Sequence, residues 1–80
     1  MNDKLRFEDA VLSEVIEDIE NHFTIDVELS NKALNNCKYT SIFNGAQADE
    51  VLETLSAVFD MQIMKEGNSS YKLTGGTCSE

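Results

Sequence analysis

The side chains with the most chemical potential in this sequence are two cysteines, Cys37 and Cys78, and one histidine, His22. The cysteines do not form a CxxC pair, and only His22 could join them as a ligand, so the set falls short of a zinc site. Nucleophilic catalysis by Cys37 would need a base, and His22 is the one imidazole available. A structural role for His22 at the C-terminus of a helix, where a cation is favourable, is the stronger interpretation.

The residues alone leave two interpretations of the cysteines open. They are two unrelated buried thiols, since free cysteine behaves as a small hydrophobic residue, or they form one disulfide, which requires an oxidising compartment. A disulfide between Cys37 and Cys78 would close a loop of about 40 residues and would contribute roughly 4 kcal/mol in the loop-entropy account.

Acidic side chains are abundant, with 15 Asp and Glu against 6 Lys and Arg and a formal net charge of −9. This balance argues against nucleic-acid binding, which needs a basic patch, and against direct contact with anionic lipid. Most of the carboxylates fall at helical spacing on outer helix faces, where they are solvated. With no glycine-rich phosphate loop and no EF-hand spacing, we expect no catalytic residue, no metal and no cofactor. The sequence predicts a binding module rather than an enzyme.

The length of 80 residues fits one small domain, residues 1–80. No apolar run approaches the ~18 residues of a membrane span, and the N-terminus lacks a signal-peptide core. If the protein works outside the cytoplasm, we expect this domain to be excised from a longer, membrane-anchored chain.

An internal repeat organises the chain. When the sequence is shifted by 36 positions it matches itself without gaps, in blocks that correspond to strand, helix and strand. The identical pairs are Phe7/Phe43, Ala10/Ala46, Glu14/Glu50, Val15/Val51, Glu17/Glu53 and Phe23/Phe59.

Apolar periodicity predicts the elements. Residues 10–22 and 46–58 each carry a single stripe with the 3.6-residue period of a helix, and Asp9 is a plausible cap for the first. Residues 24–29 alternate strictly between apolar and polar, as a strand with one buried face does. The other predicted strands are residues 5–7, 37–43, 61–65 and 71–74, with a hairpin loop at 66–70. The fold class is therefore α+β in the order β-α-β-β-α-β-β, with two helices packed on a small mixed sheet.

The order and spacing of these residues resemble the C-terminal domain of FecR-family anti-sigma factors, over about Leu5 to Cys78. Four segments carry the resemblance: Phe7-x-x-Ala10-x-Leu12-Ser13-Glu14-Val15 with His22-Phe23-Thr24-Ile25-Asp26-Val27; Leu34-Asn35-Asn36-Cys37-Lys38-Tyr39-Thr40-Ser41-Ile42-Phe43; Asp49-Glu50-Val51-Leu52-Glu53-Thr54-Leu55; and Tyr71-Lys72-Leu73-Thr74-Gly75-Gly76-Thr77-Cys78. The two-cysteine form is similar to the Bacteroidetes branch. Ser41 departs from the pattern, since many relatives carry Gly there.

The resemblance implies a periplasmic domain of a single-pass inner-membrane protein. Its partner would be the signalling domain of a TonB-dependent outer-membrane receptor, and a cytoplasmic segment outside these residues would bind the sigma factor. The periplasmic setting favours the Cys37–Cys78 disulfide. The layout is also similar to the secretin and TonB N-terminal (STN) signalling domain. The alternative is therefore the signalling domain of the receptor itself, or a secretin-type assembly module.

The binding surface predicted from the sequence is a strand edge, where a partner segment is held by backbone hydrogen bonds. Residues 1–30 hold nine acidic and two basic side chains, whereas residues 31–80 hold six and four. The C-terminal strands are thus closer to neutral, and we expect Tyr71 and Leu73 to contact the partner.

Overall fold

The computed structural model describes residues 4–78, and its element order confirms the predicted α+β class and the order β-α-β-β-α-β-β. A short 3-10 helix follows the second strand. The elements are β1 (Lys4–Val11), α1 (Leu12–Phe23), β2 (Asp26–Leu29), η1 (Lys32–Leu34), β3 (Lys38–Asn44), α2 (Ala48–Phe59), β4 (Met61–Lys65) and β5 (Ser70–Gly75).

The 36-residue repeat is visible in the backbone. The same shift carries α1 onto α2 residue for residue. Both helices end in a left-handed residue, Thr24 with φ 56° and Asp60 with φ 58°, whose N–H caps the helix. Because Thr24 ends the helix in this way, β2 begins at Asp26 rather than at the predicted residue 24.

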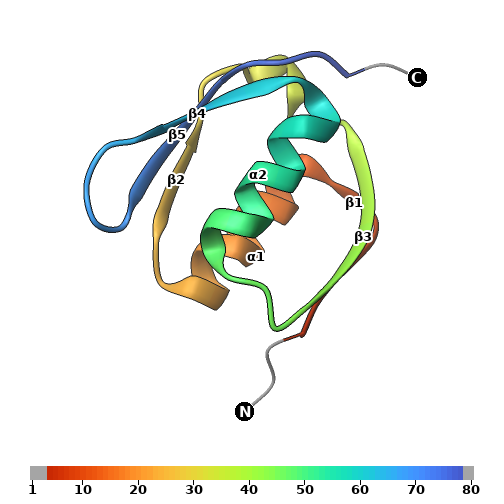
Figure 1. The fold of residues 1–80 in the computed structure, drawn as a ribbon. Coiled ribbons are helices and arrows are strands. Elements are labelled where there is room, and N and C mark those ends of the chain that lie inside the picture. The colour runs from red at the N-terminus through yellow and green to blue at the C-terminus, as the bar shows by residue number, and fades with distance from the viewer. Residues whose placement is uncertain (1–3, 79–80) are drawn as a thin grey trace.

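The strands form two sheets, and the two helices lie between them (Figure 1). β1 pairs with β3 in one sheet, and β2, β5 and β4 form the other. The strands are thus divided between two sheets, where we expected a single one. The physical reason is that each helix lies between the strand before it and the strand after it: α1 contacts β1 and β3 on one side and β2 on the other. Two small sheets can then bury apolar side chains on the same pair of helices.

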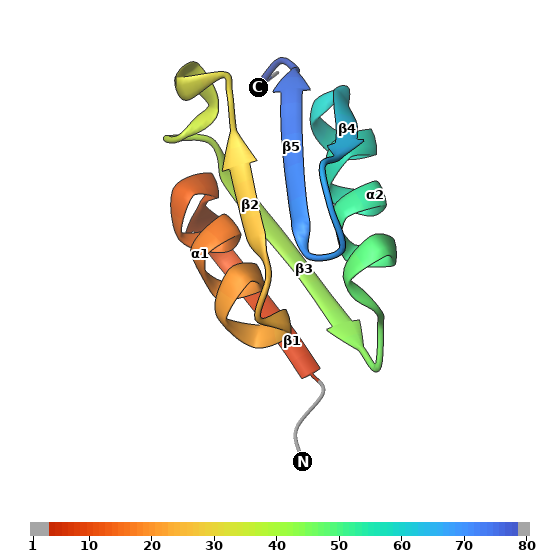
Figure 2. The ribbon, with the colours of Figure 1, turned by 90° about the vertical axis from the view of Figure 1, so that its left-hand side faces the viewer.

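β5 is the central strand of the three-stranded sheet (Figure 2). It runs parallel to β2 and antiparallel to β4. β2 and β4, the strands that follow α1 and α2, therefore do not pair with each other, because β5 lies between them. β2 and β4 are the outer strands of this sheet.

The core is continuous between the sheets and the helices. Tyr39 connects the two halves, because its ring centroid lies 6.0 Å from that of Phe7 and 5.9 Å from that of Phe59. The largest side chains with almost no exposure are Leu12, Val15, Ile19, Leu34, Val51, Leu52, Leu55 and Leu73.

The start of α1 differs from the sequence prediction. Asp9 does not cap this helix, since β1 continues to Val11 and α1 begins at Leu12 without a side-chain cap. Asp9 instead lies in a β-bulge of β1, with φ 51°, and its N–H donates to Oγ1 of Thr40 at 2.8 Å. The bulge places one extra residue in β1 opposite β3, and pairing resumes at Ala10 and continues to Val11, directly before α1. Ser41, the departure from the family pattern, pairs with Phe7 beside this bulge.

Candidate functional site: strand edges, grooves and the disulfide

The outer edge of β2 is recognised from its hydrogen bonds. The N–H groups of Asp26 and Ser30 donate to β5 and its flank, at 2.8 Å to the Ser69 carbonyl and 2.9 Å to the Leu73 carbonyl. Since N–H directions alternate along a strand, those of Val27 and Leu29 point away from β5. The Val27 N–H donates to Oε2 of Glu20 in α1, at 2.9 Å.

Glu20 therefore occupies part of the β2 edge. Carboxylates at helical spacing were expected to be solvated, and nothing in the sequence indicated that Glu20 contacts the strand. A charge on an edge strand obstructs pairing with another chain, so the carboxylate closes the middle of this edge.

The outer edge of β4 is recognised in the same way. The Glu66 N–H donates to the Ser70 carbonyl at 2.8 Å, which makes these residues a hydrogen-bonded pair of the antiparallel β4–β5 register. The N–H groups of Ile63 and Lys65 consequently point away from β5. Within residues 4–78, no side chain accepts from either of them.

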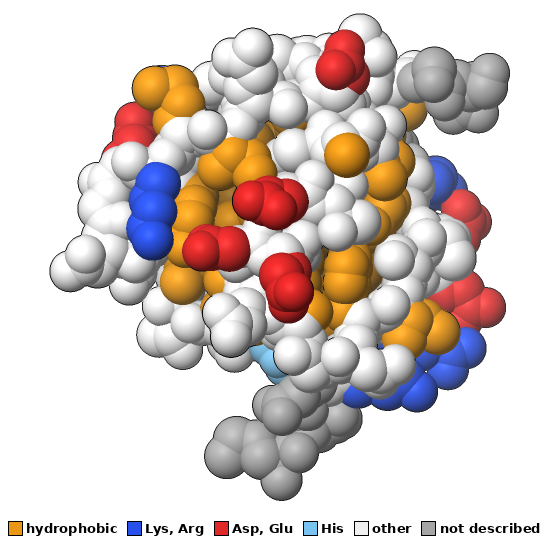
Figure 3. Space-filling view, viewed as in Figure 1, with side chains coloured by type: hydrophobic (Ala, Val, Ile, Leu, Met, Phe, Trp, Pro, Cys, Tyr) orange, Lys and Arg blue, Asp and Glu red, His pale blue; other side chains and the backbone are white. Residues whose placement is uncertain are grey.

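A groove lies between α2 and the β4–β5 hairpin, with a volume of about 280 Å³. We call it the α2–β4 groove. Its floor is apolar and its rim carries two carboxylates and one amine. It is lined by Asp49, Leu52, Glu53, Ile63, Lys65 and Tyr71. Figure 3 shows this face, where acidic side chains stand over α2 beside exposed hydrophobic surface.

A second groove, of about 310 Å³, lies between α1 and β2 and is called the α1–β2 groove. The two grooves are related by the repeat, because the 36-residue shift carries five lining residues of one onto five of the other. The pairs are Ser13/Asp49, Ile16/Leu52, Val27/Ile63, Leu29/Lys65 and Asn35/Tyr71.

Tyr71 and Leu73, the residues expected to contact a partner, lie in β5 with their side chains 8% and 0% exposed. Both neighbours of β5 are already paired. These residues thus offer neither an exposed side chain nor a free backbone edge, although the Tyr71 ring forms one wall of the α2–β4 groove. The surface next to them, on β4 and α2, is the part that a partner can reach.

The Tyr71 hydroxyl donates to Oδ1 of Asp49 at 2.8 Å. This bond favours the protonated phenol, so it raises the pKa of Tyr71 above its ordinary value, and partial burial and the charge of Asp49 act in the same direction. Nζ of Lys65 lies 5.7 Å from the centroid of the same ring. Tyr71 thus ties the start of α2 to the central strand.

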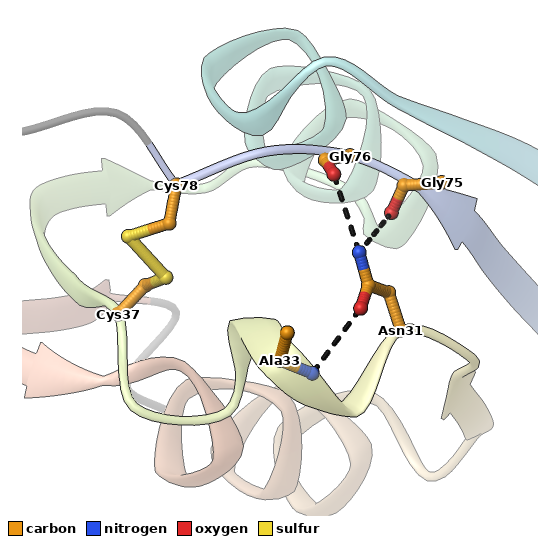
Figure 4. Close-up of a disulfide and its surroundings, with 6 residues drawn as sticks. All are labelled: Asn31, Ala33, Cys37, Gly75, Gly76 and Cys78. Carbon is orange, nitrogen blue, oxygen red and sulfur yellow. Dashed lines mark hydrogen bonds between the residues drawn. A yellow bond between two sulfur atoms is a disulfide. The ribbon is translucent and has the colours of Figure 1, made fainter.

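Cys37 and Cys78 form a disulfide in the structure, with Cα atoms 6.1 Å apart (Figure 4). Cys37 lies just before β3 and is 5% exposed, and Cys78 lies in the segment after β5. The bond connects the β1–β3 sheet with the chain that leaves the three-stranded sheet. A disulfide-bonded Cys37 has no thiol for the nucleophilic role considered above.

Asn31 holds the same segment, a role that the sequence analysis missed. Its Nδ2 donates to the carbonyl oxygens of Gly75 and Gly76 at 3.4 and 3.2 Å, and its Oδ1 accepts from the Ala33 N–H at 3.2 Å (Figure 4). A Cβ at Gly76 would lie 2.5 Å from Cγ of Met61. The pair Gly75-Gly76 was the available signal, since adjacent glycines indicate a close backbone approach.

His22 lies in the last turn of α1, as predicted, and its ring packs edge-on against Phe23 at a centroid distance of 4.7 Å.

Among the residues that the structure describes, no three His, Cys, Asp or Glu side chains gather as a metal site would require. No helix in the described range is long and apolar enough to cross a membrane.

Two crystal structures of candidate anti-sigma factors from Parabacteroides distasonis share this fold. One matches with a TM-score of 0.79 and 19% identity, covering 92% of this chain and 34% of that one. The other has a TM-score of 0.75 and 20% identity, covering 88% and 32%. The chain therefore spans about a third of the length of these proteins. No curated protein matches the sequence.

The family described as "FecR, C-terminal" matches residues 4–72, which include both helices and the strands β1 to β4. This range also holds both grooves and both outer edges of the three-stranded sheet. The chain belongs to the family of FecR C-terminal domains.

Proposed function

We propose that this domain is the periplasmic signal-receiving part of an anti-sigma factor. It binds the signalling domain of a TonB-dependent outer-membrane receptor and passes the signal on to the part of the protein that holds the sigma factor. The observation that carries the proposal is the family match over residues 4–72, and the fold shared with candidate anti-sigma factors agrees with it.

The geometry supports a protein partner rather than a small molecule. The domain presents outer strands in both of its small sheets, and an outer strand can accept an extended segment through backbone hydrogen bonds. The grooves beside these strands are shallow and carry charged rims. Such a surface suits side chains of a docked segment.

The disulfide supports the periplasmic placement, because disulfides persist in oxidising compartments and are rare in the cytosol. We further propose that this domain is joined to a single inner-membrane span and to a cytoplasmic segment that binds the sigma factor. A fusion of the full-length protein to a reporter that folds only in the periplasm tests the placement. An active reporter fused after this domain supports the placement, and an inactive reporter on a fusion protein that is expressed at full length contradicts it.

The binding function is tested by NMR titration of the isotope-labelled chain with the signalling domain of the TonB-dependent receptor encoded nearest to its gene. We expect shifts in one contiguous set of amide signals. The signalling domain of an unrelated receptor is the control and should leave the spectrum unchanged. A spectrum that does not respond to the cognate domain at high-micromolar concentration contradicts the proposal.

A further inference from the structure

The repeat makes Glu20 and Ser56 equivalent, since both lie nine residues into helices that the 36-residue shift superposes. The same shift makes Val27 of β2 equivalent to Ile63 of β4. In the first half of the chain, the Glu20 carboxylate accepts the outward N–H of Val27. In the second half, the equivalent pair is Ser56 and Ile63, and no hydrogen bond joins them in the described residues.

Ser56 cannot perform the role of Glu20, because its side chain ends two bonds earlier. The residue is only 5% exposed, and its Oγ is the one buried side-chain oxygen or nitrogen of residues 4–78 without a hydrogen-bond partner. A buried hydroxyl without a partner is costly. The second half thus has an unpaired hydroxyl in the helix and an uncapped N–H on the strand, where the first half has a closed edge.

β4 is an outer strand, and α2 lies along its outer side (Figure 2). A strand added to β4 would direct alternate side chains toward α2 and the α2–β4 groove. By contrast, β2 has only four residues. Beyond Val27, its one other outward N–H is that of Leu29, the last residue of the strand.

The lining of the α2–β4 groove defines the chemistry of the side chain that fits it. Leu52 and Ile63 provide apolar contact, and Asp49 and Glu53 place two carboxylates one helical turn apart on the rim. A lysine or arginine side chain can lay its alkyl stem on the apolar floor and direct its charge to these carboxylates. Lys65 also lines this groove, and its Nζ lies over the Tyr71 ring.

We infer that the outer edge of β4 is the docking edge of this domain. It accepts an extended segment of the receptor's signalling domain, whose backbone carbonyls receive the N–H groups of Ile63 and Lys65 and whose basic side chain enters the α2–β4 groove. The β2 edge is closed by Glu20. This inference rests on the proposed function and adds to it the edge, the register and the charge of the partner segment.

Amide hydrogen exchange on the chain, with and without the cognate signalling domain, tests the edge directly. In the free chain, we expect the Val27 amide to be protected and the Ile63 and Lys65 amides to exchange fast. On binding, Ile63 and Lys65 should become protected by about tenfold or more. The Val27 and Leu29 amides should not change.

Two substitutions at one position sharpen the test. Ser56→Glu gives β4 the carboxylate that closes β2, and it should weaken binding by about tenfold or more. Ser56→Ala is the matched control: it removes the unpaired hydroxyl, leaves the edge open and should retain binding. If Ser56→Glu does not fold, Lys65→Pro replaces it, because proline on an outer strand removes an outward N–H without breaking the ladder.

The outcomes separate the two proposals. Binding that protects β2 or the β1–β3 sheet, or that survives both Ser56→Glu and Lys65→Pro, overturns the β4 edge while the proposed function stands. No binding by the cognate domain overturns both. Protection of Ile63 and Lys65 in the chain alone, with a doubled mass by light scattering, shows that a second copy occupies the edge and overturns the assignment to the receptor.

Discussion

Nδ2 of Asn31 donates to the carbonyl oxygen of Gly76 at 3.2 Å, which joins the loop after β2 to the segment after β5. These residues are far apart in the sequence, and each follows an adjacent strand of the three-stranded sheet. The contact fixes one end of the central strand. The disulfide between Cys37 and Cys78 fixes the same segment to the other sheet a short distance further on.

The Asn31 contact predicts a specific stability loss. Asn31→Ala removes two donors and one acceptor, and it should lower the free energy of unfolding by about 1–3 kcal/mol. Asn31→Asp keeps the acceptor for the Ala33 N–H but faces the glycine carbonyls with a carboxylate. It should therefore not restore stability. Urea unfolding of the three proteins measures this, and an Asn31→Asp variant as stable as the original would show that the glycine carbonyls do not matter.

The disulfide should form in the periplasm and should stabilise the domain. Protein exported to the periplasm should show, under non-reducing mass spectrometry, the loss of two hydrogens relative to the dithiol. Cys37→Ser should lower the free energy of unfolding by about 2–4 kcal/mol. A reductant should destabilise the original protein by a similar amount and leave the variant unaffected. Two free thiols in the exported sample would contradict the prediction.

Replacing each of the two repeat-related phenylalanines with alanine should lower the free energy of unfolding by different amounts. Phe59 is 5% exposed and contacts Tyr39 in the core, whereas Phe23 is only partly buried beside His22. Phe59→Ala should cost about 3–5 kcal/mol, and Phe23→Ala should cost less. Glu17→Gln, on an exposed helix face, is the control and should be nearly neutral. Chemical unfolding measures the free energy of unfolding of the three variants. Equal losses of stability for Phe59→Ala and Phe23→Ala would contradict the packing described here.

The Tyr71–Asp49 bond predicts a titration. The hydrogen bond raises the pKa of Tyr71, so the folded state binds this proton more tightly than the unfolded state. The stabilisation is complete below the pKa of an unfolded tyrosine and is lost as the pH rises through the raised folded value. Asp49→Asn should lower the pKa of Tyr71, as measured by NMR of the labelled phenol ring. An unchanged pKa in the variant would rule out Asp49 as the main cause.

Local patterns in the sequence predicted most of the fold, because they report burial. The stripe through Val15, Ile16 and Ile19 gave helix α1, and its copy gave α2. The repeat predicted two equivalent units, and the bounds of α1 and α2, which differ by 36 positions at both ends, confirm it. The start of α1 could not be predicted in this way: Asp9 is a good helix cap by residue type, but pairing with β3 across a bulge outweighed that preference.

The candidate site was less accessible to sequence reasoning. An edge is a property of sheet order, and the placement of β5 between β2 and β4 depends on contacts across the whole chain. For this reason the sequence could not show that Tyr71, expected to contact a partner, lies in a central strand and is 8% exposed. Glu20 and Ser56 are equivalent under the 36-residue shift, but nothing in the sequence was a reason to compare them. Only the geometry showed that their difference lies at the edge of a sheet.

The central position of β5 also determines when this domain can fold during its synthesis. β2 and β4 are both made before β5, yet neither has a partner in the three-stranded sheet until Ser70–Gly75 has left the ribosome. Until then, only β1 and β3 can pair, and α1 and α2 lack cover on one side. β2 therefore stays unpaired while most of the chain is made, and β4 stays unpaired until the last strand follows it. β5 completes the sheet, and the disulfide can form only after that, because Cys78 follows β5.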